Sequence, residues 1–252
     1  MQLILALAIG AFVGGAAGYL GTLMLSKRMA LVAGPLGHLT LPGIALALTF
    51  GFDVSLGAFP MVVIGIVLIW LFEIRSKLSM EALTAVVFAS GVAITFLFLP
   101  EEKTVPALIG EASPISLLAA AVTVILCTII LVATKGIYPK MVMINISEDL
   151  AQSEGVDVKK TNFIYLTCIA LTVSLGVRIV GGLMTAALAA IPACTSYNLS
   201  KNLSEYSRGG MVLGTLACVL GIIGSMFTGI PAGLLIILTS TSFFLVSLAF
   251  KR

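Results

Sequence analysis

Charged side chains are scarce in this chain. Only 10% of its 252 residues are Asp, Glu, Lys or Arg, whereas soluble domains carry about 25%. Hydrophobic residues make up 60% of the chain, and the mean hydropathy is +1.18. Because a spanning helix needs about 20 mostly apolar residues and lipid offers no partner to an open backbone, the composition predicts an all-α integral membrane protein. Residues 1–252 are expected to form a single polytopic helical bundle without a soluble domain.

Catalytic and nucleotide-binding motifs are also lacking. The chain contains no Gly-x-x-x-x-Gly-Lys-Ser/Thr, HExxH or GxSxG sequence. Its charges lie almost wholly at the ends of apolar segments, which weakens ion-coupled secondary transport, because such carriers usually keep charged residues within their spans. We therefore expect no enzymatic activity, no covalently bound cofactor and no nucleic-acid partner. A transporter without its own coupling residue or nucleotide site needs an energising partner.

The four cysteines do not form a metal or disulfide pattern. They contain no CxxC pair, and all fall inside apolar stretches, so we interpret them as small core residues. They are Cys127, Cys168, Cys194 and Cys218.

Breaks at charged and Gly/Pro-rich points divide the chain into nine apolar segments. These segments are 2–24, 31–50, 56–73, 80–99, 114–134, 162–178, 180–197, 209–228 and 231–250. The sequence therefore predicts about nine transmembrane helices. The count becomes eight if the sixth and seventh segments form one re-entrant unit.

The placement of basic residues orients the predicted bundle. Twelve of the 14 Lys and Arg residues follow the first, third, fifth, seventh and ninth segments, and only Lys103 and Arg178 fall on the other side. Cytoplasmic loops are enriched in Lys and Arg. We expect the N-terminus outside, the C-terminus in the cytoplasm, and a multi-pass protein of the inner or plasma membrane.

Three glycines repeat at intervals of four in the first segment. Gly10, Gly14 and Gly18 share one helix face, which permits close approach of another helix. Packing within the chain is the interpretation we favour, and a dedicated dimer face is the alternative.

One sizeable polar stretch, 135–161, is expected to form a cytoplasmic loop. Asn145 followed by Glu148 resembles a capping box, and Gly155 can provide a left-handed stop. The pattern predicts a short helix over residues 146–154, with acidic residues in its first turn, where they favour the positive end of the dipole.

Two interpretations of this short helix remain open on the residues alone. It is either a capped connector or a docking helix for a cytoplasmic partner. The docking interpretation supplies apolar contacts from Met141, Met143, Ile146 and Leu150, and polar ones from Glu148 and Asp149.

The only histidine, His38, lies in the stretch GPLGHLTLPG at 34–43. On the residues alone, a buried neutral histidine bonded to a neighbouring helix is the favoured interpretation. Pro42 removes a backbone N–H and leaves an earlier carbonyl without its helical donor. We interpret it as a break that turns carbonyls toward a cavity.

Several stretches resemble the permease subunits of the metal-ion ABC importers, the zinc, manganese and iron family. The family's second span usually reads Gly-Asp-x-x-Ser-His-x-x-Leu-Pro-Gly, and residues 33–43 are similar to it. Residues 108–116 resemble an outer-loop motif, and residues 147–155 resemble the acidic coupling segment. Residues 180–195 resemble the "VGxLL…ALLIIPAATA" stretch, and Gly224, Pro231 and Gly233 echo a late motif.

The resemblance implies a permease that forms the pathway for a divalent transition metal, zinc or manganese. It further implies a homodimer of permeases, cytoplasmic ATPase subunits and an extracytoplasmic substrate-binding protein. The short acidic helix would be the ATPase coupling helix, carried by Ser147, Glu148, Asp149, Leu150 and Gly155. Two alternatives stay open: a permease of the same architecture for a metal chelate or another small solute, and an ATPase-independent channel or secondary carrier.

The chain departs from the family at its metal ligands. Gly34 stands at the position of the family's Asp, and Gly229 at that of a late Asp, while His38 is kept. With the resemblance, His38, Gly34 and Pro42 are expected along the metal pathway. A neutral imidazole replaces one water ligand without offsetting charge, so we expect weak binding.

Two further positions complete the expected pathway. Glu111 is expected at the outer entrance, where it contacts the binding protein or attracts cations; an ordinary solvated charge is the alternative. Pro192 is expected as a kink or helix end near the cytoplasmic gate.

Overall fold

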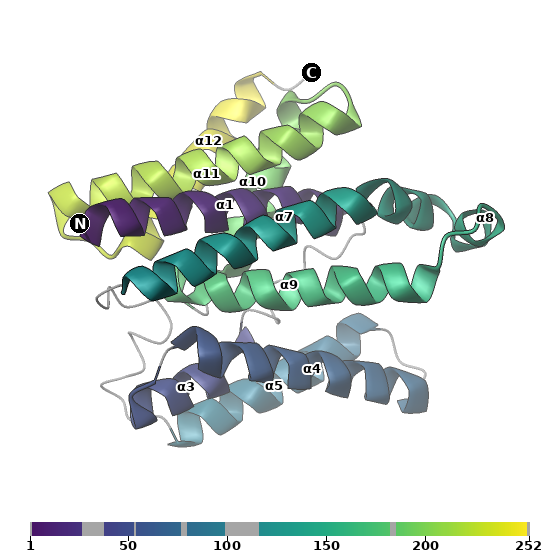
Figure 1. Ribbon diagram of the computed structural model, residues 1–252, viewed down its shortest axis with the longest axis horizontal. Coiled ribbons are helices and arrows are strands. Elements are labelled where there is room, and N and C mark those ends of the chain that lie inside the picture. Colours follow the sequence, from purple (N-terminus) through teal and green to yellow (C-terminus); the bar gives the residue numbers. More distant parts are fainter. Residues whose placement is uncertain are drawn as a thin grey trace.

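The computed structural model describes residues 2–26, 38–52, 54–76, 80–98, 116–181 and 185–250 (Figure 1). Every regular element within these ranges is a helix, as the composition predicted. The helices are α1 (Gln2–Ser26), α3 (Leu41–Phe50), α4 (Val54–Ser76), α5 (Met80–Phe98), α7 (Leu117–Ile146), α8 (Glu148–Ser153), α9 (Val158–Val180), α10 (Thr185–Leu199), α11 (Leu203–Thr228) and α12 (Ala232–Ala249).

Several of these helices can cross a membrane. Among the described residues, five helices are long and apolar enough to do so: α1, α7, α9, α11 and α12. Shorter apolar stretches occur in α4 and α5, at Leu56–Ile69 and Ala85–Leu97. The 15 residues of α10 extend about 22 Å, less than the roughly 30 Å of a hydrocarbon core. The chain is therefore a multi-pass helical membrane protein; nine spans and the orientation stay predictions.

Helix α1 lies at the centre of the larger part of the bundle, where it packs against α7, α9, α10 and α11. Helices α3, α4 and α5 pack on one another as a separate group, and α4 contacts α9 (Figure 1). The C-terminal helix α12 covers α10 and α11. The fold thus joins a small three-helix layer to a larger bundle through the α4–α9 contact.

The glycine face of α1 packs against α11 of the same chain. A Cβ at Gly14 would collide with the backbone carbonyl of Gly214, and a Cβ at Gly18 would collide with that of Gly210. Because no side chain separates them, the two helix backbones approach closely. The expectation of packing within the chain is confirmed.

Helix α7 is longer than the sequence predicted. Residues 135–146, expected in the cytoplasmic loop, continue this helix to Ile146, and residues 158–161 already belong to α9. Tyr138, Met141 and Ile144 recur at helical spacing and are buried, whereas Lys140 is exposed on the opposite side. The basic residues therefore lie on the outer face of an amphipathic helix. The connection shrinks to residues 147–157.

Candidate functional site

Helix α8 is capped by Ser147, which alone separates it from α7. The Ser147 N–H donates to the carbonyl of Met143 at 3.0 Å and closes α7, while its hydroxyl accepts from the Leu150 N–H at 3.3 Å. Asn145, predicted as the cap, instead lies in the last turn of α7. Serine and asparagine are equally good N-caps, so the choice depended on where the buried face of α7 ends. Glu148 opens the first turn of α8 as predicted.

Gly155 ends α8 in the left-handed conformation that the sequence predicted. Its φ is +76°, a region that favours glycine. The Gly155 N–H donates to the carbonyl of Gln152 at 3.0 Å, and the Val156 N–H donates to that of Ala151 at 2.9 Å. These two bonds form a Schellman motif. The six-residue helix is therefore capped at both ends, by Ser147 at its N-terminus and by the Gly155 motif at its C-terminus.

One face of the short helix packs on the protein, and the opposite face is exposed. Ala151 is fully buried against the core, while Leu150 is 50% and Ile146 75% exposed. Glu148 and Asp149 are exposed beside them. The outward face of α8 and the end of α7 thus combines apolar side chains with carboxylates.

Two of the residues that were predicted to contact a partner are less accessible than expected. Met141 is fully buried, so its proposed role as a partner contact is wrong, and Met143 is only half-exposed to the surroundings. Met141 lies on the face of α7 that packs on the bundle. Of the four apolar side chains predicted as contacts, Ile146 and Leu150 are the exposed ones.

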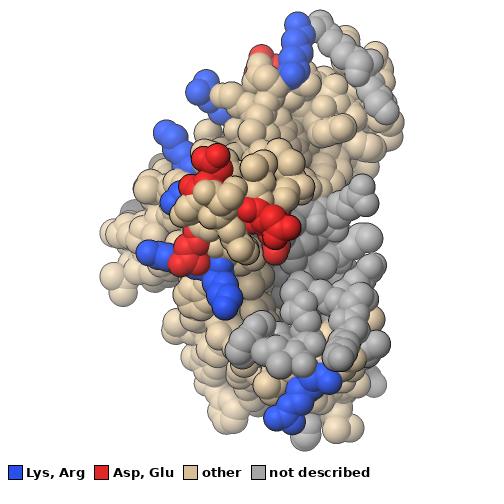
Figure 2. All heavy atoms as spheres, turned by 90° about the vertical axis from the view of Figure 1, so that its right-hand side faces the viewer, with Lys and Arg blue, Asp and Glu red and all other residues tan. Residues whose placement is uncertain are grey.

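Charged side chains gather on the face of the molecule that carries α8 (Figure 2). The exposed acidic residues here are Glu148, Asp149, Glu154 and Asp157, and the exposed basic residues around them are Lys140, Lys159 and Lys160. The Asp157 carboxylate caps α9 by accepting from the Lys160 N–H at 2.9 Å. Both ends of the α8 connection are therefore fixed by side-chain caps.

The single histidine lies beside α5. His38 is half-buried, and its ring centroid is 4.9 Å from that of Phe88, with the planes tilted by 44°. Pro42 lies in the first turn of α3, so the predicted break in the second segment falls at residues 39–40. Gly34 and Glu111, also predicted as site residues, lie outside the described residues.

The part of the chain that the structure describes brings together no group of three or more His, Cys, Asp or Glu side chains that could hold a metal ion. Within the described residues, His38 therefore does not belong to such a group. Gly229 is exposed at the C-terminus of α11 with φ +70°, and it terminates that helix. A conformational role accounts for glycine at this position.

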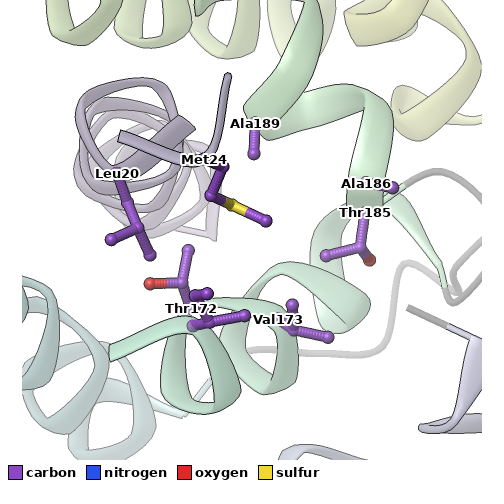
Figure 3. Close-up of a pocket in the computed structure, with 8 residues that line it drawn as sticks. Leu20, Met24, Thr172, Val173, Thr185, Ala186 and Ala189 are labelled. Carbon is purple, nitrogen blue, oxygen red and sulfur yellow. The ribbon is translucent and has the colours of Figure 1, made fainter. Parts of the chain in front are cut away.

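Pro192 lies inside α10 and is buried. It leaves the Leu188 carbonyl without its usual helical donor. A cavity of about 10 Å³ lies nearby between α1, α9 and α10 (Figure 3). Its threonine hydroxyls donate to their own helices, Thr172 to the Cys168 carbonyl at 2.8 Å and Thr185 to the Gly181 carbonyl at 2.7 Å. This cavity is apolar, has room for about one water, and offers no ligand site.

Sequence reasoning missed a buried polar cluster at the α8 end of the bundle. Thr22 of α1, Tyr138 of α7, Ser196 of α10 and Tyr206 of α11 are all buried and joined by hydrogen bonds. The only signal in the sequence is the occurrence of hydroxyl side chains in otherwise apolar helices. Their partners are up to 184 positions away, so spacing could not identify them.

Comparison with known proteins gives consistent matches over nearly the whole chain. The profile of the ABC 3 transport family matches residues 1–251. The high-affinity zinc uptake system membrane protein ZnuB of Buchnera aphidicola is 24% identical over 241 residues, which cover 91% of this chain and 90% of the relative. The manganese import system permease protein ScaB of Streptococcus parasanguinis is 26% identical over 249 residues, covering 97% and 88%.

A solved structure has the same fold. The chain is similar to PsaBC from Streptococcus pneumoniae in complex with Fab, with a TM-score of 0.83 and 24% sequence identity, over 96% of this chain and 89% of that one.

Proposed function

Because the chain belongs to the ABC 3 transport family, we propose that it is the permease subunit of an ATP-binding-cassette importer for a divalent transition-metal ion, zinc or manganese. The relatives named for zinc uptake and manganese import support this substrate class. The observation that carries the proposal is α8, a short capped helix with an exposed acidic and apolar face at the charged end of the bundle. The chain has no nucleotide motifs of its own, and α8 offers a surface on which a separate ATPase can bind and drive transport.

The same charged end supports a membrane topology for the proposed permease. The exposed charges of α7, α8 and α9 lie where α7 ends and α9 begins, and these two long apolar helices extend from there in the same direction (Figure 1). Basic residues favour the cytoplasmic side. Nine spans with an outer N-terminus and a cytoplasmic C-terminus fit this placement and put α8 in the cytoplasm.

The partner at α8 is a cytoplasmic ATPase subunit. Ile146 and Leu150 enter an apolar groove on its surface, and Glu148 and Asp149 contact basic groups at the rim of that groove. Burial of Ala151 and the caps at Ser147 and Gly155 hold the helix in one position on α7 and α9. A preorganised helix loses little entropy on docking.

The pathway for the ion includes His38 and Pro42, with Gly34 before them, and Pro192 lies at the cytoplasmic gate. The imidazole supplies a nitrogen ligand, and backbone carbonyls at the break before α3 supply oxygen. This weak site suits an ion delivered by a high-affinity extracytoplasmic binding protein, with Glu111 at the outer entrance. A second copy of the permease completes the pathway.

Docking at α8 is tested by a matched pair of substitutions. Leu150→Asp places a third carboxylate on the outward face of α8, while Leu203→Asp makes the same change at a leucine of α11 that is 44% exposed. Co-expression with the ATPase and affinity purification from membranes measures assembly. We expect the ATPase to be lost from the Leu150 variant and kept by the Leu203 variant. Retention of the ATPase by the Leu150→Asp protein would refute docking at α8.

A further inference from the structure

Three buried hydrogen bonds join four helices at the α8 end of the bundle, with Thr22 and Tyr206 each taking part in two of them. We propose that Tyr138, Thr22, Tyr206 and Ser196, here called the tyrosine relay, are positioning residues that transmit displacement of α8 to α10. The ATPase state and the conformation of α10 then change together. The inference rests on the proposed function, because it assigns a route between the ATPase contact and a helix of the transport pathway.

The direction of each hydrogen bond can be assigned. The Thr22 hydroxyl donates its single proton to the Tyr19 carbonyl at 2.7 Å. The Tyr138 hydroxyl must therefore donate to Thr22 Oγ1, 3.0 Å away. The Tyr206 hydroxyl donates to the Thr22 carbonyl at 3.2 Å, and the Ser196 hydroxyl donates to the Tyr206 carbonyl at 2.7 Å. The relay thus runs from α7 through α1 and α11 to α10.

The middle of the relay is a stiff unit. Gly14 and Gly18 of α1 contact the carbonyl groups of Gly214 and Gly210 of α11 without intervening side chains. Thr22 follows Gly18 by one turn, and Tyr206 precedes Gly210 by one turn. The bond between them therefore extends a backbone-to-backbone contact. Two helices locked in this way move together, so a force on Thr22 reaches Tyr206.

Both ends of the relay lie beside prolines in the interior of helices. Tyr138 directly precedes Pro139 of α7, and Ser196 lies one turn after Pro192 of α10. Each proline removes one intrahelical hydrogen bond, so bending concentrates at these positions. The relay is attached where each of the two helices bends most easily.

The connection from α8 to the relay is short and direct. Tyr138 precedes the end of α7 at Ile146 by eight residues, about 12 Å of helix. Ser147 then leads into α8, which is held against α7 and α9 through Ala151. Displacement of α8 by an ATPase therefore bends α7 at Pro139 and pulls on the Tyr138–Thr22 bond.

Buried hydroxyl groups are costly in an apolar bundle, and polar residues in spans are often functional. A purely static role, as adhesive between helices, is the competing explanation. The two accounts differ in what a single hydroxyl deletion changes. Loss of a contact that only stabilises helix packing lowers stability alone. Loss of a contact that transmits motion uncouples ATP hydrolysis from transport.

Tyr138→Phe and Ser196→Ala remove the hydroxyl groups at the two ends of the relay. The Phe substitution keeps the ring contact with Tyr19, whose centroid is 5.4 Å away. Tyr165→Phe is the matched control, because Tyr165 is a fully buried tyrosine on α9. Each variant is reconstituted in proteoliposomes with its ATPase and binding protein. Mn²⁺ uptake, ATP hydrolysis and the melting temperature are then measured.

We expect Tyr138→Phe and Ser196→Ala each to lower the Mn²⁺ transported per ATP hydrolysed by about three- to fivefold, the range that corresponds to one buried hydrogen bond. The Tyr165→Phe complex keeps the wild-type ratio even if its melting temperature falls. The double variant Tyr138→Phe with Ser196→Ala should have the same Mn²⁺-to-ATP ratio as the single variant with the lower ratio, because both changes interrupt one route.

An unchanged ratio in both single variants, with lowered melting temperatures, would assign the cluster a static role and overturn the relay. If Tyr138→Phe does not assemble, Ser196→Ala decides the question from the other end. Failure of the proposed function looks different: the wild-type complex itself would then take up neither Mn²⁺ nor Zn²⁺ with ATP.

Discussion

Replacement of Gly18 by alanine tests the stiff α1–α11 contact on which the relay depends. The added Cβ would collide with the Gly210 carbonyl oxygen and would lie 2.9 Å from the carbonyl carbon of the same residue. These are backbone atoms of a helix, so neither can move alone, and α1 and α11 must separate. Overpacking of this kind costs about 1–3 kcal/mol.

Two other glycines provide a scale for this effect. At Gly10 the new methyl group would meet chiefly the Cδ1 atom of Ile222, the flexible end of a side chain that can rotate away, so the cost is smaller. At Gly136 on α7 nothing lies within 4 Å, and alanine should stabilise the helix by up to about 1 kcal/mol. The structure predicts the order of stability Gly136→Ala, wild type, Gly10→Ala, Gly18→Ala.

Thermal unfolding of the purified chain in detergent measures this order. In a protein of about this length, 1 kcal/mol shifts the melting temperature by about 2–4 °C, so Gly18→Ala should melt about 2–12 °C below wild type. Gly136→Ala should melt at or above the wild-type temperature. A Gly18→Ala protein that melts with wild type, or no lower than Gly10→Ala, would refute the close backbone contact.

Three further predictions concern the candidate sites. Gly155→Ala should weaken ATPase co-purification more than Gly155→Asn, because the φ of +76° costs alanine about 1–2 kcal/mol whereas asparagine tolerates this region; equal effects would show that the left-handed stop is unimportant. Ser147→Ala should raise amide hydrogen exchange within α8 by about fivefold through loss of about 1 kcal/mol of capping, and Ser147→Asp should restore protection; no difference between the two would argue against the cap. His38→Ala should lower Mn²⁺ uptake while the ATPase still co-purifies, whereas unchanged uptake would reduce the imidazole to a packing contact with Phe88.

Much of this fold could be predicted because the relevant information is local. The apolar segment at 231–250 appears as α12 (Ala232–Ala249), and the segment at 209–228 appears as the apolar part of α11 (Leu203–Thr228). The first turn of α11 was missed because it is polar and is capped by Asn202, which accepts from the Glu205 N–H at 2.9 Å. The left-handed Gly155 and the family were also predicted correctly.

The errors arose where tertiary contacts decide the structure. Helix α7 continues past Lys135 because its buried face, with Tyr138 and Met141, still has a bundle to pack on. The charges on its outer face suggested a loop. The cap of α8 moved from Asn145 to Ser147 for the same reason. The tyrosine relay could not be predicted from the sequence, because no spacing along the chain relates Thr22 to Tyr206.

We propose that this chain transports a divalent transition metal only when an ATPase acts on it through α8. Uptake of Mn²⁺ or Zn²⁺ into proteoliposomes that contain the wild-type permease, its ATPase and the binding protein is the most direct test. We predict uptake that requires hydrolysable ATP and is abolished by Leu150→Asp but not by Leu203→Asp. Equal uptake without ATP, or equal uptake by the Leu150→Asp chain, would show that transport does not depend on an ATPase bound at α8.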